Sequence, residues 1–158
     1  MSEGRAQGGE EMKKIGEYTA RGRLPKTPAI HKVTLFDGRF DTGYRIVGFK
    51  VALVDTDSIN VRQWIGKLAT VGDLGHQWKW DNQNELAWAM YSDDANTSTS
   101  PSYFSHWDED ALIIEDLYVY GSEGAGNTEA MNYEIKLEKY EFSDWKGALA
   151  MARDKQSE

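Results

Sequence analysis

The chain has 158 residues, of which 40% are hydrophobic and 12% aromatic, which is enough for one folded domain with its own core. It contains no cysteine, which excludes disulfides, thiolate zinc sites and cysteine nucleophiles. The formal net charge is −8, yet residues 1–32 carry seven Lys/Arg against four Asp/Glu. This acidic balance disfavours nucleic acid and membranes as partners, and only the basic leading stretch could contact nucleic acid.

Residues 1–29 have several glycines, two prolines and few large apolar side chains. Such a composition cannot bury enough surface to offset the entropy of ordering the chain, and it predicts a flexible basic N-terminal arm. We expect the arm to contact neighbouring subunits through Lys13, Lys14, Arg21 and Arg23. The first residues lack the apolar centre of a signal peptide, and no apolar run reaches the roughly 18 to 20 residues that span a bilayer. We therefore expect a cytoplasmic protein without a membrane span.

Residues 30–158 predict a single β-sandwich domain. Several short stretches alternate apolar and polar residues, and turn-forming residues separate them. Residues 44–54 place Val47, Phe49, Val51 and Leu53 on one face, and residues 130–142 place Met131, Tyr133, Ile135 and Leu137 on another. The predicted strands are 30–36, 44–54, 85–91, 111–121 and 130–142, together with 59–70, for which a short helix is the alternative.

Two further segments complete the predicted architecture. Residues 92–110 are rich in Ser, Asp and Asn and predict a long polar loop. Ser143 is a favourable N-cap for a short C-terminal helix, whose Trp145, Leu149 and Met151 would pack on a sheet. With no βαβ alternation, the pattern predicts a mainly all-β fold, an antiparallel sandwich resembling a jelly roll, with an extended N-terminal arm.

Three of the six tryptophans fall within "WKWDNQNELAW", residues 78–88. Trp78 and Trp80 share a face if the segment is extended, and Asp81 and Asn82 follow them with side chains that hydrogen-bond hydroxyl groups. This spacing fits a carbohydrate-binding platform. It fits equally a subunit contact or core packing, because tryptophan is favoured at interfaces. Trp88, inside a predicted strand, is expected in the core.

Catalytic patterns are weak. "DTG" at 41–43 is the tripeptide of aspartic proteases, but that chemistry needs two aspartates sharing a proton, and the sequence has no second copy. The three histidines, at 31, 76 and 106, have no chelating spacing; only His106 with Asp108 hints at a metal. No nucleophile, base and oxyanion site come together in the sequence. We therefore expect no enzyme activity, no cofactor and no metal.

The stretches "DTGYRIVGFKVA", "LIIEDLYVYG" and "MNYEIKLEKYEFSDWKGALAMARDKQ" resemble small β-rich proteins encoded by environmental, largely marine, viruses. The resemblance spans most of residues 33–156 and includes no catalytic motif. It implies a virion structural component, a jelly-roll capsid or capsid-associated subunit, with itself and other virion proteins as partners. The competing hypothesis is a carbohydrate-binding β-sandwich module that uses Trp78 and Trp80.

Overall fold

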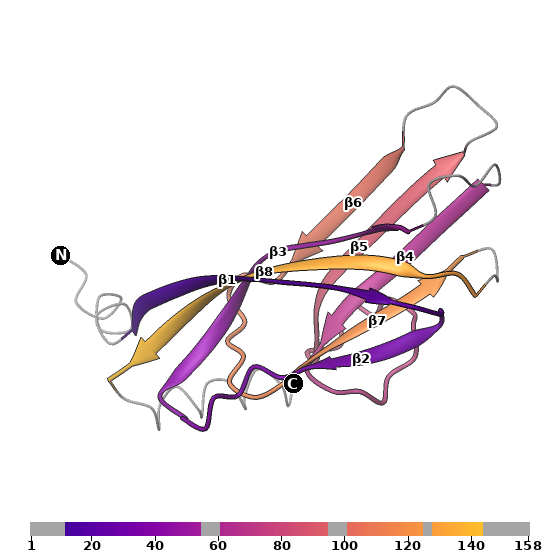
Figure 1. Ribbon diagram of the computed structural model, residues 1–158. Helices are drawn as coiled ribbons and strands as arrows, with labels where there is room; N and C mark the ends of the chain where they lie inside the picture. The colour runs from indigo at the N-terminus through magenta and orange to yellow at the C-terminus, as the bar shows by residue number, and fades with distance from the viewer. Residues whose placement is uncertain (1–11, 55–60, 95–100, 125–127, 144–158) are drawn as a thin grey trace.

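The chain folds into two facing antiparallel β-sheets (Figure 1). The computed structural model describes residues 12–54, 61–94, 101–124 and 128–143, and in these ranges it contains eight strands and no helix. The strands are β1 Met12–Leu24, β2 Ala29–Val33, β3 Thr42–Leu53, β4 Val61–Ala69, β5 Glu85–Asp94, β6 Ser102–Trp107, β7 Leu117–Glu123 and β8 Met131–Phe142. The predicted all-β sandwich is confirmed, while the predicted C-terminal helix lies outside the described residues.

The strand order resembles that of a jelly roll except at β6. One sheet has the order β1-β8-β3, and the other has the order β2-β7-β4-β5-β6. The first and last strands, β1 and β8, thus pair in one sheet, while β2 and β7 pair in the other. In a regular jelly roll, β6 would pair with β3. Here it pairs with β5, although the Ser105 hydroxyl still donates a hydrogen bond to the Phe49 carbonyl of β3.

The core lies between the sheets and follows the alternation of their strands. In β8 the four residues predicted to face inward, Met131, Tyr133, Ile135 and Leu137, are all buried. Gly66 of β4 allows the sheets to approach closely, because a Cβ there would lie 2.7 Å from Val51 Cγ1. Most of the buried apolar side chains between the sheets thus form one core, and Leu112 and Phe142 form a second, smaller cluster.

A β-bulge in β3 changes which residues face the core. The pairing with β8 shifts between Ile46 and Gly48, so Val47 is an extra residue that leaves the alternation. Ile46 is fully buried while Val47 is 37% exposed. The prediction that Val47 faces the core is therefore wrong, although it holds for Phe49 and Val51.

The prediction of a flexible arm over residues 1–29 is wrong for residues 12–24. This segment is β1, which pairs with β8 from Met12 to Leu24, and β2 begins at Ala29. The sandwich therefore begins no later than Met12 and not at residue 30, and residues 1–11 lie outside the described part. Pairing with the central strand supplies backbone hydrogen bonds along almost the whole of β1, which composition alone does not reveal.

Two other predictions are settled by the strand positions. Val61–Ala69 is a strand, so the helical alternative for residues 59–70 is wrong where the structure describes it. The predicted polar loop at 92–110 is wrong for the stretch that forms β6 and for the last residues of β5. In the described ranges no helix is long and apolar enough to cross a membrane.

Candidate binding site

The connection between β4 and β5, residues 70–84, crosses the outer face of the five-stranded sheet. Tyr120 of β7 holds its first part, since the phenol donates to the Val71 carbonyl (2.6 Å) and accepts from the Leu74 amide (3.0 Å). Further along, the Trp78 ring stacks on Phe104 of β6, with centroids 5.6 Å apart. The outer face of this sheet is therefore covered by a folded segment.

A buried ion pair anchors this covering segment to the sheet. Lys67 of β4 and Glu85 of β5 are 1% and 0% exposed, and Lys67 Nζ lies 2.8 Å from Glu85 Oε2. Lys67 also donates to the Gln77 carbonyl (2.7 Å), and its ammonium lies 4.9 Å from the centre of the Tyr120 ring. Glu85 Oε1 accepts from the Lys79 amide (2.8 Å) and from Trp88 Nε1 (3.0 Å). Both charges are thus satisfied, as buried charges must be.

A tight turn after Lys79 sets the position of Trp80. The Asn82 amide donates to the Lys79 carbonyl and the Glu85 amide to the Asn82 carbonyl, each at 3.0 Å. The Asn82 side chain accepts from the Asn84 amide (2.9 Å), an Asx turn. Trp80 is therefore presented on a backbone fixed at both ends.

Trp80 rests on three other aromatic rings. Its ring centroid lies 5.3 Å from Trp88, 5.5 Å from His106 and 6.4 Å from Phe104, with interplanar angles of 34°, 22° and 23°. Trp88 and His106 are partners across β5 and β6, and their rings stack at 5.8 Å. Because the planes are nearly parallel, they form a layered ledge. We use the name aromatic ledge for Trp78, Trp80, Trp88, Phe104 and His106.

An open cavity of about 570 Å³ adjoins the ledge. Trp80, 57% exposed, is its most accessible indole. Carboxylates lie on the other side, in the turn after β6, where the Asp108 amide donates to the Leu86 carbonyl (2.8 Å) and the Asp110 amide to Asp108 Oδ1 (3.0 Å). The lining residues are Trp80, Trp88, Ser105, His106, Trp107, Asp108, Glu109 and Asp110. The cavity thus combines aromatic faces with hydrogen-bond acceptors, and no Lys or Arg is among the described residues that line it.

A second hollow of about 420 Å³ lies beneath the covering segment, between His76, Trp78, Ile65 and Met90. The Nδ1 atom of His76 and the Nε1 atom of Trp78 are buried there without a hydrogen-bond partner. Burial, with a smaller contribution from Lys67, lowers the pKa of His76. The neutral form of the imidazole is therefore favoured.

The structure brings together only part of the predicted platform. Trp78 and Trp80 both belong to the ledge, but Trp78 is half-buried against Phe104 and only Trp80 is open. Asp81 is exposed and does not line the cavity, and Asn82 is engaged in its turn. Trp88 is buried as predicted, and it also lines the cavity.

Sequence reasoning missed the rest of the site. Phe104 and His106 lie in the stretch that the sequence predicts as a loop, where the carboxylates of residues 108–110 are expected to be solvated, with only a weak indication of a metal. No group of three or more His, Cys, Asp or Glu in the described ranges could hold a metal ion. The available signal was the pair of rings at Phe104 and His106, two positions apart in β6. That His106 lies beside Trp88 depends on the register between β5 and β6.

The cations expected to contact neighbouring subunits lie on β1 of the three-stranded sheet. Lys14 Nζ approaches Glu17 (2.6 Å) and Glu138 of β8 (2.9 Å), and these carboxylates raise its pKa. Arg21 lies 4.0 Å from Glu134 of β8. Lys13 and Arg23 are exposed on the same strand. Two of the four cations, Lys14 and Arg21, are thus paired with carboxylates of the same chain.

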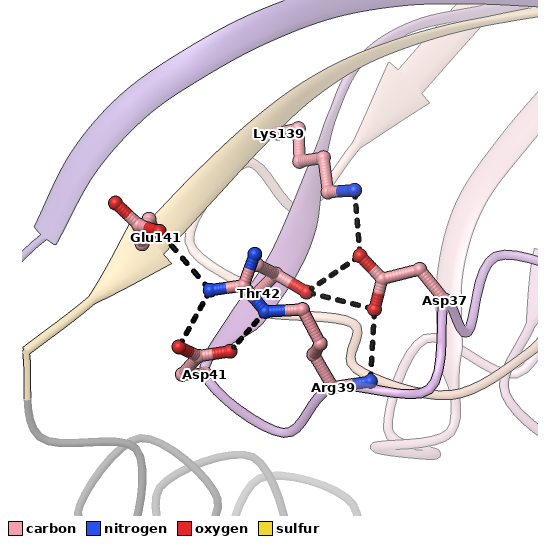
Figure 2. Close-up of polar contacts among 6 residues, drawn as sticks. All are labelled: Asp37, Arg39, Asp41, Thr42, Lys139 and Glu141. Atoms are coloured by element: carbon pink, nitrogen blue, oxygen red, sulfur yellow. Dashed lines mark hydrogen bonds and ion pairs between the residues drawn. The ribbon is translucent and has the colours of Figure 1, made fainter.

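Asp41 of the "DTG" tripeptide is held by a guanidinium (Figure 2). Arg39 Nε and Nη2 donate to its two oxygens at 2.8 and 2.7 Å, which lowers the pKa of Asp41, and Nη2 also reaches Glu141 (3.1 Å). From the sequence alone, "DGRFDTG" is more simply interpreted as a hairpin turn, but the segment links β2 to β3 in the opposite sheet, so that interpretation is wrong. The bidentate contact gives Asp41 a structural partner and holds it ionised, unlike the shared proton of a protease pair.

No protein-family model matches the chain, and a search of curated proteins finds no match to it. The fold and the geometry of the site are therefore the basis for the function proposed below.

Proposed function

We propose that this chain is a non-enzymatic structural subunit of a virus particle, a capsid or capsid-associated protein that assembles with copies of itself and with other virion proteins. The observation that carries the proposal is the jelly-roll strand order together with an open sheet edge. Jelly rolls recur in viral shells because a small rigid sandwich exposes edges and loops for repeated contacts. Lectin domains share this architecture, so the strand order by itself does not favour a shell protein. The open sheet edge is the second observation that supports the proposal.

The edge strand in question is β1, one of the strands that end a sheet in the described ranges. This strand has 13 residues and, in the described ranges, pairs with β8 on one side only. Ile15 sits at the register shift between Lys14 and Gly16, where it is 44% exposed. Unpaired backbone groups along such an edge can accept a strand from a neighbouring copy. An exposed isoleucine at the edge adds apolar area to such a contact.

Protein partners fit this edge better than nucleic acid. Lys14 and Arg21 lie against Glu138 and Glu134 of the same sheet, so a phosphate would compete with these carboxylates. The body of the chain is also strongly acidic, which opposes a polyanion at longer range.

The test is light scattering on a sizing column at several protein concentrations, with the full chain and with Ile15→Lys. A lysine on an open edge opposes pairing with a second strand. We expect oligomers for the full chain, and smaller species for the variant with an unchanged melting temperature. Phe40→Lys, a change at a similarly exposed residue outside the strands, is the control and should assemble normally. A full chain that stays monomeric at every concentration would contradict the proposal.

A further inference from the structure

The aromatic ledge and its adjoining cavity have no part in the assembly proposed above. They lie on the five-stranded sheet, while the open edge of β1 belongs to the other sheet. A soluble domain seldom leaves a tryptophan as exposed as Trp80 beside further aromatic rings without a binding role. The arrangement of the rings and charges indicates which ligand would bind.

The ring planes favour a flat ligand. His106 and Phe104 lie within 23° of the Trp80 plane and Trp88 within 34°, so the rings stack in layers and leave a flat indole surface open. A quaternary ammonium group needs aromatic walls on several sides. A pyranose ring, in contrast, presents a flat face of C–H groups that can lie on one indole, with its hydroxyls pointing outward.

The charges of the cavity favour a neutral ligand rich in hydroxyl groups. Asp108, Glu109 and Asp110 bring acceptor oxygens to the cavity, and an ionised carboxylate accepts hydrogen bonds and donates none. Sugar hydroxyls supply the matching donors. Sialic acid or sulfate groups would meet these carboxylates with no Lys or Arg among the lining residues to offset the repulsion.

The site is also largely preformed. The backbone at Trp80 is fixed by the bond from the Lys79 amide to buried Glu85, and that carboxylate is held by Lys67. The acidic turn is fixed by the bond from the Asp108 amide to Leu86. A ligand therefore orders little of the protein on binding, which preserves affinity at a small open site.

From these features we infer that the cavity beside the aromatic ledge binds a neutral glycan, with one sugar ring stacked on Trp80 and its hydroxyls donating to the carboxylates of residues 108–110. Asp81 and Asn82, which the sequence places in the platform, have no part in this inferred site.

The experiment exposes the full chain to immobilised neutral, sialylated and sulfated oligosaccharides, then titrates the best ligand against tryptophan fluorescence. We expect retention on neutral glycans only. Trp80→Ala should weaken that binding by about tenfold or more, and Asp110→Asn by a few-fold, as loss of one stacking or hydrogen-bond contact implies. Tyr103→Ala removes another exposed aromatic side chain, next to Phe104 but on the opposite face of β6, and is the matched control.

Several outcomes would overturn the inference. These are absence of binding to every glycan, preference for anionic glycans, tighter binding of choline than of any sugar, and a Trp80→Ala variant that binds as well as the unchanged chain. A Trp80→Ala variant that changes the oligomeric state would instead assign the ledge to a subunit contact. Assembly is measured separately through Ile15→Lys, so failure of one proposal leaves the other standing.

Discussion

The outer faces of the two sheets differ in chemistry, although both come from the same alternation of side chains. On the three-stranded sheet the outer face of β8 carries Glu134, Lys136 and Glu138 beside cations of β1 and β3. On the five-stranded sheet the outer face carries Lys67, Trp88 and His106 beneath and beside the 70–84 segment. One face is a solvated set of ion pairs, and the other is a covered, partly aromatic surface.

The contrast shows where polar groups matter to this fold. Charges on the open face can exchange partners with water, so each contributes little to stability. Lys67 and Glu85 have lost their water, so each depends on the other and on its hydrogen bonds. The polar pair that matters most to stability therefore lies on the covered face, and the proposed binding surface depends on the same pair.

The largest expected loss of stability is that caused by Lys67→Met. The change leaves the buried Glu85 without its counter-charge and should lower the free energy of unfolding by about 3 to 5 kcal/mol. Urea denaturation measures it, with Lys50→Met on the open face as the control, where we expect a change below about 0.5 kcal/mol. Equal losses from the two lysines would remove the distinction between the faces. Adding Glu85→Gln to Lys67→Met should recover part of the loss.

A smaller effect is expected at the end of the sandwich, where Asp37 ties the β2–β3 connection to β8 (Figure 2). Its carboxylate accepts from Lys139 Nζ (2.7 Å) and from the Thr42 hydroxyl (3.1 Å), and the bond from Lys139 is the main cause of the lowered pKa of Asp37. A lowered folded-state pKa stabilises the fold above the ordinary Asp value of about 3.9. That contribution is lost as the pH falls through the folded-state pKa.

Asp37→Asn should therefore cost about 1 to 2 kcal/mol near neutral pH and have a flatter stability profile in acid. Thermal melts between pH 7 and pH 2 measure this. Parallel profiles for the variant and the unchanged chain would show that Asp37 does not contribute to the acid dependence. The connection carries no part of the aromatic ledge, so glycan binding should be unaffected at neutral pH.

The smallest effect is expected for Glu134→Gln on the open face. The change removes the partner of Lys50 (3.5 Å) and of Arg21 (4.0 Å), yet both cations are exposed. We expect a change in unfolding free energy below about 0.5 kcal/mol, which high salt would reduce further. A loss comparable to that of Lys67→Met would mean that the outer face of β8 is not a solvated surface in solution.

The sequence predicted the fold class because strands with one buried face follow a period of two. β8 is the clearest case, with every second residue from Met131 to Leu137 buried. The same rule failed at Val47, where an extra residue in the bulge shifts the side chains that follow. It also failed for β1, because an edge strand that buries few large side chains depends on pairing with a strand more than a hundred residues away.

The candidate site was predicted only in its tryptophans. Trp78 and Trp80 were visible as a pair, but the ledge also needs His106 beside Trp88, which only the β5–β6 register supplies. Likewise Lys67 and Glu85 are 18 residues apart and meet only because β4 and β5 are neighbours and the connection folds back over them. Local patterns carry no information on such long-range pairs.

The place of β8 in the middle of the three-stranded sheet also governs how the protein can be made. Both β1 and β3 pair with β8, the last strand that the structure describes, and neither pairs with the other. This layer therefore cannot form on the ribosome until β8 has emerged, more than a hundred residues after β1, and it requires the closure of long loops, which slows folding. Until then β1 lacks its partner β8 and is available to any other strand that reaches it first.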